Sequence, residues 1–600
     1  MLKIIKLLRP HWKAVIAVIG LLLVQALCEL KLPGLMSDIV DIGLVRGGVA
    51  DADATYMAQV AAGGADVQVQ MKYMWLVGGK MALIAMAAAA AAVTLGLISA
   101  KVGSAIGRDL RRDVFTKVVG FSHTELDSFS TASLITRCTN DIVQVQMTCV
   151  MLLRMVLYAP IMGAGGVAKV AAARSGLGWI VAAAVGGLFL LLMVLLLVAM
   201  PKFKKMQELV DNVNLVSREI LTGLPVIRAF ARERYEEKRF DGANTALRDT
   251  QLFTGRTMAA MMPFMNLIMY GISIAIVWFG GKSIQAGSLE IGDMMAFTNY
   301  AMQIVFSFMM LSMISIMAPR AIVAAERIYE VLDTENVIHA PEQGTVAQGD
   351  GEIEFRDVSF CYPGAEDCAL EHISFTARPG ETTAIIGSTG CGKTTLLNLI
   401  LRFYDVSEGS ITLDGVDLRE IDLHGLRGRM GYVPQKAVLF SGDIASNIGY
   451  AGDVPADRME AAAQVAQAAA FISEKPEGLA SHIAQGGSNV SGGQKQRLSI
   501  ARAIASDPDI YLFDDSFSAL DYKTDSALRA ALKTHAADAT VIIVAQRIAT
   551  VMHADQIIVL SDGKIDGIGT HSQLLHSCET YREIAVSQLS EEELGLEVDA

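Results

Sequence analysis

Residues Thr382–Ile400 read TTAIIGSTGCGKTTLLNLI, and this stretch decides the fold of the second half of the chain. An apolar strand pattern runs from Thr382 to Ile386, and an apolar helical pattern follows the glycine-rich turn. Glycines allow backbone N–H groups to turn toward phosphates, and the helix N-terminus adds its positive end. We therefore expect a phosphate-binding loop in which Lys393 reaches the β- and γ-phosphates of a nucleotide and Thr394 offers its hydroxyl to Mg²⁺. The other expected nucleotide contacts are Gly387, Ser388, Thr389, Gly390, Cys391, Gly392 and Thr395.

A second apolar run ends in adjacent carboxylates, because Ile510–Asp521 reads IYLFDDSFSALD. We expect a buried strand here that lies beside the strand Thr382–Ile386. Asp514 would then help to hold Mg²⁺, and Asp515 stands where a phosphate-loop ATPase places the base for its attacking water. The alternative is a pair of solvated acids at the end of a strand. The alternating pattern of Gly351–Tyr362, GEIEFRDVSFCY, predicts a further strand after a polar linker.

Composition separates the two halves of the chain. The 600 residues are 52% apolar and 19% charged, with a net charge of −13 and a mean hydropathy of +0.40. The length suggests about three or four domains, and the apolar excess lies in the first half. The acidic balance argues against nucleic acid as a partner, because a phosphate-binding surface needs a basic excess. Seven scattered cysteines form no CxxC pair or even framework, so neither a zinc site nor a disulfide scaffold is predicted.

Six long apolar windows in the first half predict a membrane domain. Each could span, or nearly span, a hydrocarbon core of ~30 Å at a rise of ~1.5 Å per residue, although a buried core helix is the alternative for any one window. The basic N-terminal stretch before them is interpreted as a retained cytoplasmic lead-in and not as a signal peptide. The windows are Ala14–Cys28, Met81–Ala100, Met147–Ala173, Leu177–Met200, Met258–Gly281 and Met294–Ala318.

Lysine and arginine are concentrated in the N-terminal lead and in two connections, one between spans two and three and one between spans four and five. This bias predicts that both chain ends lie in the cytoplasm. The two basic connections are predicted to extend as helices beyond the membrane, each with a short piece that contains a turn, Ser128–Ile135 and Thr222–Phe230. The long, weakly charged loop Val45–Lys72 is predicted as an external excursion.

Two features of the spans bear on a cargo cavity. Arg154 lies inside the third span, where a charge is costly and usually faces protein or water. It would either line a cavity and meet the cargo or pair with a neighbour or a lipid headgroup. Spans five and six are rich in methionine, which suits surfaces that fit several ligands, although plain packing explains any single one.

The segment Asn489–Ile504, NVSGGQKQRLSIARAI, lies between the phosphate-binding loop and the acid-ended strand. In that place SGGQ resembles the signature of the ATP-binding cassette (ABC) proteins, and six spans followed by one cassette resemble an ABC exporter half-transporter. The resemblance implies an α-helical six-span transmembrane domain followed by an α/β P-loop NTPase domain. We expect the transmembrane domain at 1–333, a linker at 334–350, the cassette at 351–588 and an acidic, disordered tail at 589–600.

The resemblance also implies roles for residues outside the phosphate-binding loop, with ATP and Mg²⁺ as the bound species. Tyr362 would stack on adenine, and Gln435 would contact both Mg²⁺ and the membrane domain. Asp521 would bridge the two ATP sites of a pair of cassettes. The short pieces of the two basic connections resemble coupling helices. The γ-phosphate of an ATP held by another cassette would be bound by Ser491, Gly492, Gly493 and Gln494.

Two residues depart from the family pattern at one site. Asp515 stands where the family usually has Glu, and Gln546 stands where it usually has His. Asp is one methylene shorter, so its carboxylate falls roughly 1 Å short of the base position. Gln hydrogen-bonds a phosphate but carries no titratable proton, and the loss of a positioned base costs ~10²–10⁴ in rate. We therefore expect ATP to bind here and to be hydrolysed slowly; the alternative is a tolerated swap in an active homodimer.

An intact signature on a chain whose own ATP site is impaired predicts that the signature serves the ATP site of a different chain. The chain resembles the degenerate-site subunits of bacterial heterodimeric multidrug exporters, so its signature would serve a partner that carries Glu and His. Gln485 agrees, because many homodimeric exporters have Glu there. The expected partners are a second, non-identical half-transporter, membrane lipid and an exported amphiphilic substrate such as a drug, a lipid or a peptide. The alternatives are a homodimeric exporter with a slow site and an ATP-gated regulatory membrane protein that does not pump.

Overall fold

The computed structural model describes residues 6–51, 57, 60, 66–172, 176–339, 341, 344–589 and 594. The chain divides into two compact units, one of residues 1–119 and 131–333 and the other of residues 120–130 and 334–600. The second unit therefore includes a short piece of the first basic connection. The centre of the predicted excursion Val45–Lys72 and most of the predicted tail 589–600 lie outside the described residues.

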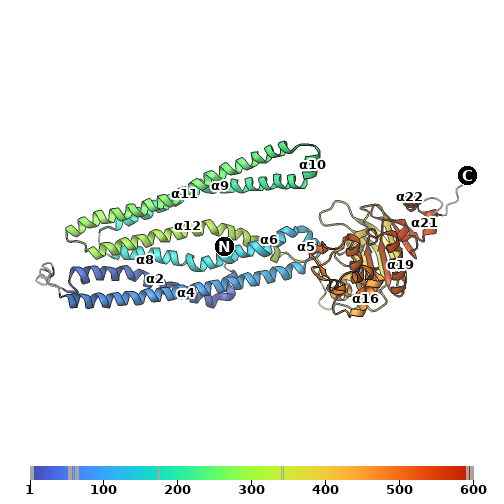
Figure 1. Ribbon diagram of the computed structural model, residues 1–600, viewed down its shortest axis with the longest axis horizontal. Helices are drawn as coiled ribbons and strands as arrows, with labels where there is room; N and C mark the ends of the chain where they lie inside the picture. The colour runs from blue at the N-terminus through green and yellow to red at the C-terminus, as the bar shows by residue number, and fades with distance from the viewer. Residues whose placement is uncertain are drawn as a thin grey trace. The chain divides into compact units, whose positions relative to one another are not determined.

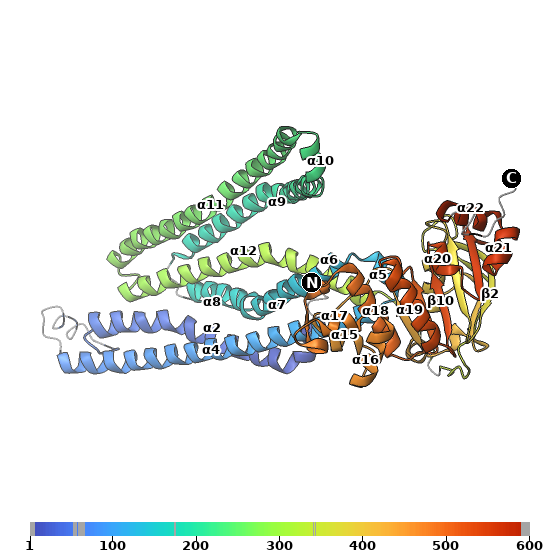
Figure 2. The ribbon, with the colours of Figure 1, turned by 45° about the vertical axis from the view of Figure 1, so that its right-hand side comes forward.

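The first unit consists of long helices that run along one another (Figure 1). α2 packs along α4, and α9 packs along α11, with the short helix α10 at the end of the α9–α11 hairpin (Figure 2). The third predicted span is interrupted by the π-helical stretch η4, and a second π-helical stretch, η3, lies before it. The bounds are η1 Arg9–His11, α2 Trp12–Asp38, η2 Ile39–Val45, α4 Val67–Val119, α6 Thr131–Thr136, η3 Arg137–Asp141, α7 Ile142–Met151, η4 Leu152–Val156, α8 Tyr158–Ala172, α9 Gly178–Thr222, α10 Leu224–Ala229, α11 Glu233–Gln285 and α12 Ile291–Asp333.

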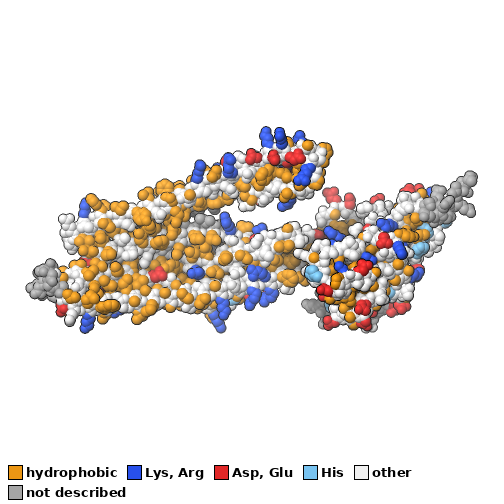
Figure 3. All heavy atoms as spheres, in the orientation of Figure 1, with side chains coloured by type: hydrophobic (Ala, Val, Ile, Leu, Met, Phe, Trp, Pro, Cys, Tyr) orange, Lys and Arg blue, Asp and Glu red, His pale blue; other side chains and the backbone are white. Residues whose placement is uncertain are grey.

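In the described chain, five helical stretches are long and apolar enough to cross a membrane. They overlap five of the six predicted windows, and the remaining window falls in the first half of α9, where Gly178–Leu191 is a shorter apolar segment. Figure 3 shows hydrophobic side chains over the visible face of this unit and Lys and Arg toward the α10 end of the α9–α11 hairpin. Leu267 and Ile274 on α11 are 65% and 70% exposed, which suits contact with lipid.

The second unit is an α/β domain around a six-stranded sheet of order β12-β11-β3-β10-β9-β6, parallel except for β12. An antiparallel sheet of order β2-β1-β4-β5 and a β7-β8 pair complete it. The strands are β1 Ile353–Phe360, β2 Leu370–Ala377, β3 Thr382–Gly387, β4 Glu408–Leu413, β5 Val416–Asp417, β6 Met430–Val433, β7 Gly442–Asp443, β8 His482–Ile483, β9 Ile510–Asp514, β10 Thr540–Val544, β11 Gln556–Ser561 and β12 Lys564–Gly569. The helices are α5 His123–Ser128, α13 Lys393–Ile400, η5 Leu418–Glu420, α14 Leu423–Gly428, α15 Ile444–Ile448, α16 Ala456–Val465, α17 Ala469–Ser473, η6 Gly478–Ala480, η7 Gln485–Gly487, α18 Gly492–Ala505, α19 Tyr522–His535, α20 Ile548–Val551, α21 His571–Ser577 and α22 Glu579–Gln588.

From the sequence we expected the acid-ended strand β9 to lie beside β3, but the structure separates the two strands. β10 inserts between them, with Val541 opposite Thr382 of β3 and Thr540 opposite Ile510 of β9. The order of strands depends on contacts between segments far apart in the chain, which hydrophobic periodicity does not report. The carboxyl ends of the three parallel strands still meet at one edge of the sheet, where open α/β sheets bind their ligands.

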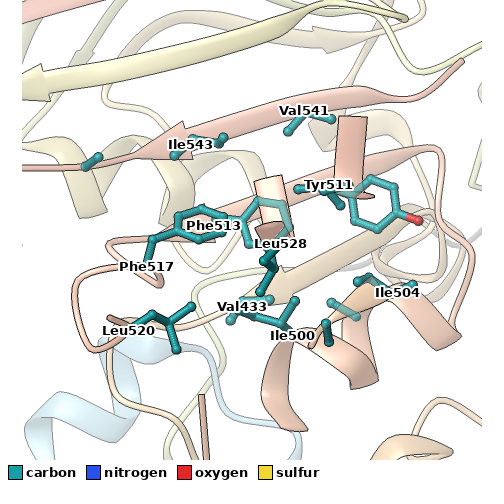
Figure 4. Packing of buried hydrophobic residues seen from close by; sticks show 14 of the residues in the cluster. Val433, Ile500, Ile504, Tyr511, Phe513, Phe517, Leu520, Leu528, Val541 and Ile543 are labelled. Atoms are coloured by element: carbon teal, nitrogen blue, oxygen red, sulfur yellow. The ribbon is translucent and has the colours of Figure 1, made fainter. Parts of the chain in front are cut away.

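β9 is buried on both faces, as a central parallel strand requires. Tyr511 and Phe513 pack on one face with Val433 and Leu528 (Figure 4), and Leu512 joins a second core cluster on the other face. This packing fixes the end of the strand, where the two carboxylates follow. The predicted fold class, an α-helical transmembrane domain followed by an α/β P-loop domain, is confirmed.

One pair of cysteines lies closer together than the sequence indicates. The sequence predicted no disulfide scaffold, but Cys361 and Cys368 form a disulfide in the loop between β1 and β2. Their separation of seven residues matches no cysteine motif, and only the hairpin formed by the two strands brings the residues together. The other five cysteines are free.

Candidate nucleotide-binding site

The glycine-rich turn connects β3 to α13, as the sequence predicts. Gly390 and Gly392 have φ values of +88° and +99°, in the left-handed region that favours glycine. A Cβ on Gly392 would lie 2.6 Å from Leu370 Cδ2, and a Cβ on Gly387 would lie 2.1 Å from Leu560 O. The turn therefore depends on glycine both for its backbone conformation and for its close approach to neighbouring backbone.

Lys393 begins α13 and is 8% exposed. Its Nζ donates hydrogen bonds to Gly387 O at 2.8 Å and to Ser388 O at 2.6 Å, both in the turn itself. A buried ammonium that is held by neutral carbonyls at a helix N-terminus is a strong site for an anion. The donors of this turn therefore fit the phosphates of a nucleotide.

Asp514 and Thr394 lie together at the carboxyl edge of the sheet. Thr394 Oγ1 donates to Asp514 at 3.0 Å and 3.1 Å from its two carboxylate oxygens. Burial raises the pKa of Asp514; the Thr394 hydrogen bond opposes that rise, and the Asp515 charge adds to it. A hydroxyl and a carboxylate are oxygen ligands of the kind that Mg²⁺ prefers. The described residues contain no cluster of three or more His, Cys, Asp or Glu that could hold a metal.

Asp515 is 9% exposed and has a φ of +44°, which is unusual for a residue other than glycine. Its Oδ2 accepts hydrogen bonds from Gln546 Nε2 at 3.3 Å and from Gln435 Nε2 at 3.4 Å. Its N–H donates to Val544 O at 2.9 Å, which ties it to the end of β10. The structure thus brings together the two departures from the family pattern, and it adds Gln435 to them.

Tyr362 lies in the loop between β1 and β2, close to the start of α13. Its hydroxyl shares a hydrogen bond of 3.0 Å with Thr395 Oγ1. Its ring meets Phe360 and Tyr404 edge-on, with centroid separations of 4.9 Å and 5.3 Å. The residue expected to stack on adenine is therefore half-buried and anchored beside the phosphate-binding turn.

The signature residues form a local structure at the start of α18. Ser491 is the N-cap, and it makes a reciprocal capping box with Gln494: Gln494 N donates to Ser491 Oγ at 3.3 Å, and Ser491 N donates to Gln494 Oε1 at 3.0 Å. Gly492 has open space around it. Asp521 caps α19, and hydrogen bonds from Thr524 lower its pKa. Ser491, Gly492 and Asp521 are exposed, as a surface that meets another molecule must be.

Sequence reasoning missed the contacts of α5. This helix precedes the short piece predicted at Ser128–Ile135, whereas α10 falls inside the piece predicted at Thr222–Phe230. Tyr404 donates its hydroxyl to Asp127 Oδ2 at 2.7 Å, and the His123 ring stacks on Phe403 at 4.2 Å. Burial, followed by the Asp127 hydrogen bond, raises the pKa of Tyr404. Tyr404 also contacts the ring of Tyr362, so it connects α5 to the residue expected to stack on adenine. Asp127 and Tyr404 are 277 residues apart in the chain, and no local sequence pattern reports such a contact.

A polar cluster inside the helical unit was also missed. Gln25 Nε2 donates to Glu29 Oε1 at 2.9 Å, and the Tyr158 hydroxyl donates to the other carboxylate oxygen of Glu29. Gln303 Nε2 lies 3.4 Å from Glu29 O. Arg154, four residues before Tyr158, is exposed. Glu29 directly follows the first apolar window. An acid at that position usually has polar partners, so it was the sequence signal from which the cluster could have been predicted.

The phosphate-binding turn, the acid-ended strand and the long apolar helices together define a membrane-bound P-loop ATPase. Residues 15–308 match the family model of the ABC transporter transmembrane region, and residues 370–518 match that of the ABC transporter. The chain belongs to the ABC transporters, with the membrane domain and the ATPase domain of an exporter half-transporter on one polypeptide.

Three known proteins illustrate the similarity. An uncharacterized ABC transporter ATP-binding protein of Mycobacterium tuberculosis is 40% identical over 587 residues, 97% of each chain. An ATP-dependent lipid A-core flippase of Pseudomonas aeruginosa is 33% identical over 502 residues, 82% of each chain. A solved structure of a bacterial Atm1-family ABC exporter with ATP bound aligns with a TM-score of 0.77 and 26% identity, and it covers 97% of this chain and 99% of that chain.

Proposed function

We propose that this chain is one half of a heterodimeric ABC exporter and that its own ATP site hydrolyses slowly. The observation that carries the proposal is the pairing of Asp515 with two neutral amides, Gln435 and Gln546. The heterodimer would export amphiphilic small molecules such as drugs, lipids or peptides across the cytoplasmic membrane. The lipid A-core flippases among the relatives support an amphiphilic cargo.

The position of the base favours slow hydrolysis. A general base must reach the proton of the attacking water, and an Asp carboxylate falls roughly 1 Å short of a Glu carboxylate. In this chain the same Oδ2 also accepts both amide hydrogen bonds, which hold it near β10. Gln546 can orient a phosphate but cannot exchange a proton. A rate loss of ~10²–10⁴ is the ordinary cost of a missing base.

Nucleotide binding does not depend on these two departures. Lys393 and the backbone of the turn would hold the phosphates, Thr395 would add a hydroxyl, and Tyr362 would support the adenine ring. Thr394, Asp514 and Gln435 would hold Mg²⁺, which neutralises phosphate charge when bound. The chain would therefore keep ATP bound for long periods.

The intact signature argues for a partner. Ser491 and Gly492 lie exposed, and Gly493 half-buried, at the N-terminus of α18, where backbone N–H groups and the helix dipole favour a phosphate. Their use requires a second cassette with a phosphate-binding turn of its own. A non-identical partner with Glu and His would supply the active site, and this chain would complete it. Both chain ends would lie in the cytoplasm, in agreement with the distribution of Lys and Arg.

The test is to co-express the chain with candidate partner half-transporters and to measure the ATPase activity of the purified pair. Substitution of the partner's catalytic Glu by Gln should lower the activity by ~10²–10⁴, whereas Asp515→Asn should lower it by no more than about tenfold. Asp453→Asn, at an exposed cassette position, is the matched control and should leave the activity unchanged. A larger loss from Asp515→Asn than from the partner substitution would overturn the proposal.

A further inference from the structure

The loop between β1 and β2 carries both Tyr362 and the Cys361–Cys368 disulfide. We infer that Cys361 and Cys368 form a reversible thiol-oxidation site, and that its disulfide holds Tyr362 in place and tightens nucleotide binding. The inference rests on the proposed role of Tyr362 beneath adenine, because a loop that carried no nucleotide contact would have nothing to regulate. It adds a cysteine modification that responds to disulfide-class oxidants.

The fold closes the neck of this loop. Ala369 N donates to Phe360 O at 2.8 Å, so the two chain segments are adjacent where the strands end. The disulfide joins the next residues on each side, Cys361 and Cys368. Cys361 N also donates to Ser407 Oγ at 3.1 Å, which fixes the backbone directly before Tyr362. The thiols of a reduced chain would therefore stay close to each other.

The loop beyond the neck is exposed. Pro363 to Asp367 are exposed, and the two cysteines are only half-buried, so a small oxidant or reductant reaches them. The thiol groups of two other cysteines in this unit, Cys391 and Cys578, are buried and free. Access and a nearby second thiol are two features of redox-sensor cysteines, and the loop has both.

The position of Tyr362 explains why the disulfide would change binding. The ring is anchored at its hydroxyl by Thr395, a residue that is 6% exposed in the first turn of α13, and along its edges by Phe360 and Tyr404. The disulfide anchors the backbone one residue earlier. Reduction would leave the loop held only by hydrogen bonds and ring contacts, and the entropy cost of ordering the loop would then oppose nucleotide binding. Oxidation orders the loop before the nucleotide binds, so this entropy cost no longer reduces the affinity; the binding loop is preorganised.

The chemistry balances with an oxidant of the disulfide class, such as oxidised glutathione. One cysteine thiolate attacks a sulfur of the oxidant, which forms a mixed disulfide and releases one glutathione thiolate. The second cysteine thiolate attacks the protein sulfur of the mixed disulfide and releases the second glutathione thiolate. The chain loses two electrons and two protons, and the oxidant is reduced to two glutathione molecules. In a reducing cytoplasm such disulfides are rare and typically act as redox sensors.

The experiment uses the full-length chain and a fluorescent ATP analogue as the probe. The dissociation constant is measured after treatment with dithiothreitol and after treatment with oxidised glutathione, and the Cys361–Cys368 peptide is quantified by mass spectrometry. The oxidised chain should bind the analogue about two- to tenfold more tightly than the reduced chain. Cys361→Ser and Cys368→Ser should each bind like the reduced parent under both conditions. Cys391 remains in all three chains, so its own oxidation would appear equally in each.

Three results would overturn the inference: no Cys361–Cys368 peptide after oxidation, equal affinity of the oxidised and reduced parent, or a redox effect that is as large in the Ser variants as in the parent. The comparison on the parent chain needs no substitution, so a variant that fails to fold does not remove the test. Tyr362→Ala separates the two proposals. If it leaves the affinity unchanged, the adenine role in the proposed function fails; if it weakens binding while the redox state has no effect, only the disulfide inference fails.

Discussion

At the scale of single residues, the site is an arrangement of short polar contacts around one edge of the sheet. Asp515 accepts from Gln435 and Gln546, and Asp514 accepts from Thr394. The glycine-rich turn between β3 and α13 was predictable, because a strand, a set of glycines and a helix follow one another locally in the sequence. The amide pairing of Asp515 was not predictable, because Asp515, Gln435 and Gln546 come from three separate segments of the chain.

Gly392→Ala should destabilise the cassette and weaken nucleotide binding. The residue has a φ of +99°, and its added Cβ would lie 2.8 Å from Ala369 O. We expect a loss of about 1–3 kcal/mol in the free energy of unfolding. Thermal unfolding of the purified protein measures the change. Gly428→Ala is the matched control, because a Cβ there meets nothing within 4 Å and its φ lies outside the left-handed region.

Lys393→Met should abolish high-affinity nucleotide binding without unfolding the cassette. The substitution keeps much of the side-chain volume and removes the ammonium group that now bonds to Gly387 O and Ser388 O. We expect a loss of affinity of at least about tenfold, the effect of about 1.4 kcal/mol. Titration with a fluorescent ATP analogue measures it, and unchanged affinity would contradict the assignment of the turn as the phosphate site.

At the scale of elements, the sequence predicted the long helices of the first unit and three strands of the second, but not which elements lie side by side. The windows and basic connections located the long helices, because their signals are local and strong. The position of β10 between β3 and β9, the contacts of α5 and the Cys361–Cys368 pair were missed. Each of these depends on residues that are distant in the chain or on a turn whose geometry has no sequence motif.

Glu125 shows how α5 is held in the α/β unit, and it gives a pH prediction. It is 4% exposed, and it accepts from Ser122 N at 2.7 Å and from Val337 N at 2.8 Å. Burial alone would raise its pKa, but the hydrogen bonds from Ser122 and Val337 outweigh burial, and the net pKa is lowered. Its stabilising effect is therefore complete above the ordinary carboxyl pKa of 4.5 and is lost as the pH falls through the lower folded-state value.

Glu125→Gln should cost about 1–3 kcal/mol in the free energy of unfolding at pH 7, because charged hydrogen bonds become neutral ones. The difference between parent and variant should shrink as the pH falls below 4.5. Denaturant unfolding at pH 7 and at pH 4 measures both values. Glu460→Gln, at an exposed position on α16, is the control and should have little effect at either pH. A difference that grows in acid would contradict the assignment of the lowered pKa.

At the scale of the whole molecule, the basic connections predict the orientation in the membrane. Asp66 lies in the expected external excursion, and Asp350 is exposed in the expected cytoplasmic linker. Asp66→Cys should react with a membrane-impermeant maleimide in intact cells, whereas Asp350→Cys should react only after lysis. Labelling of the parent chain gives the background from its own free cysteines. The reverse pattern would place both chain ends outside the cell and would remove access to cytoplasmic ATP.

The central claim is that the two ATP sites of the heterodimer are unequal, and the ATPase rate of this chain purified without any other half-transporter tests it most directly. The parent is compared with the double variant Asp515→Glu/Gln546→His, which restores the residues usual in the family at both positions. We predict slow turnover by the parent and a rise of at least about tenfold in the double variant. Fast hydrolysis by the unaltered chain, with no gain from the double substitution, would contradict the account.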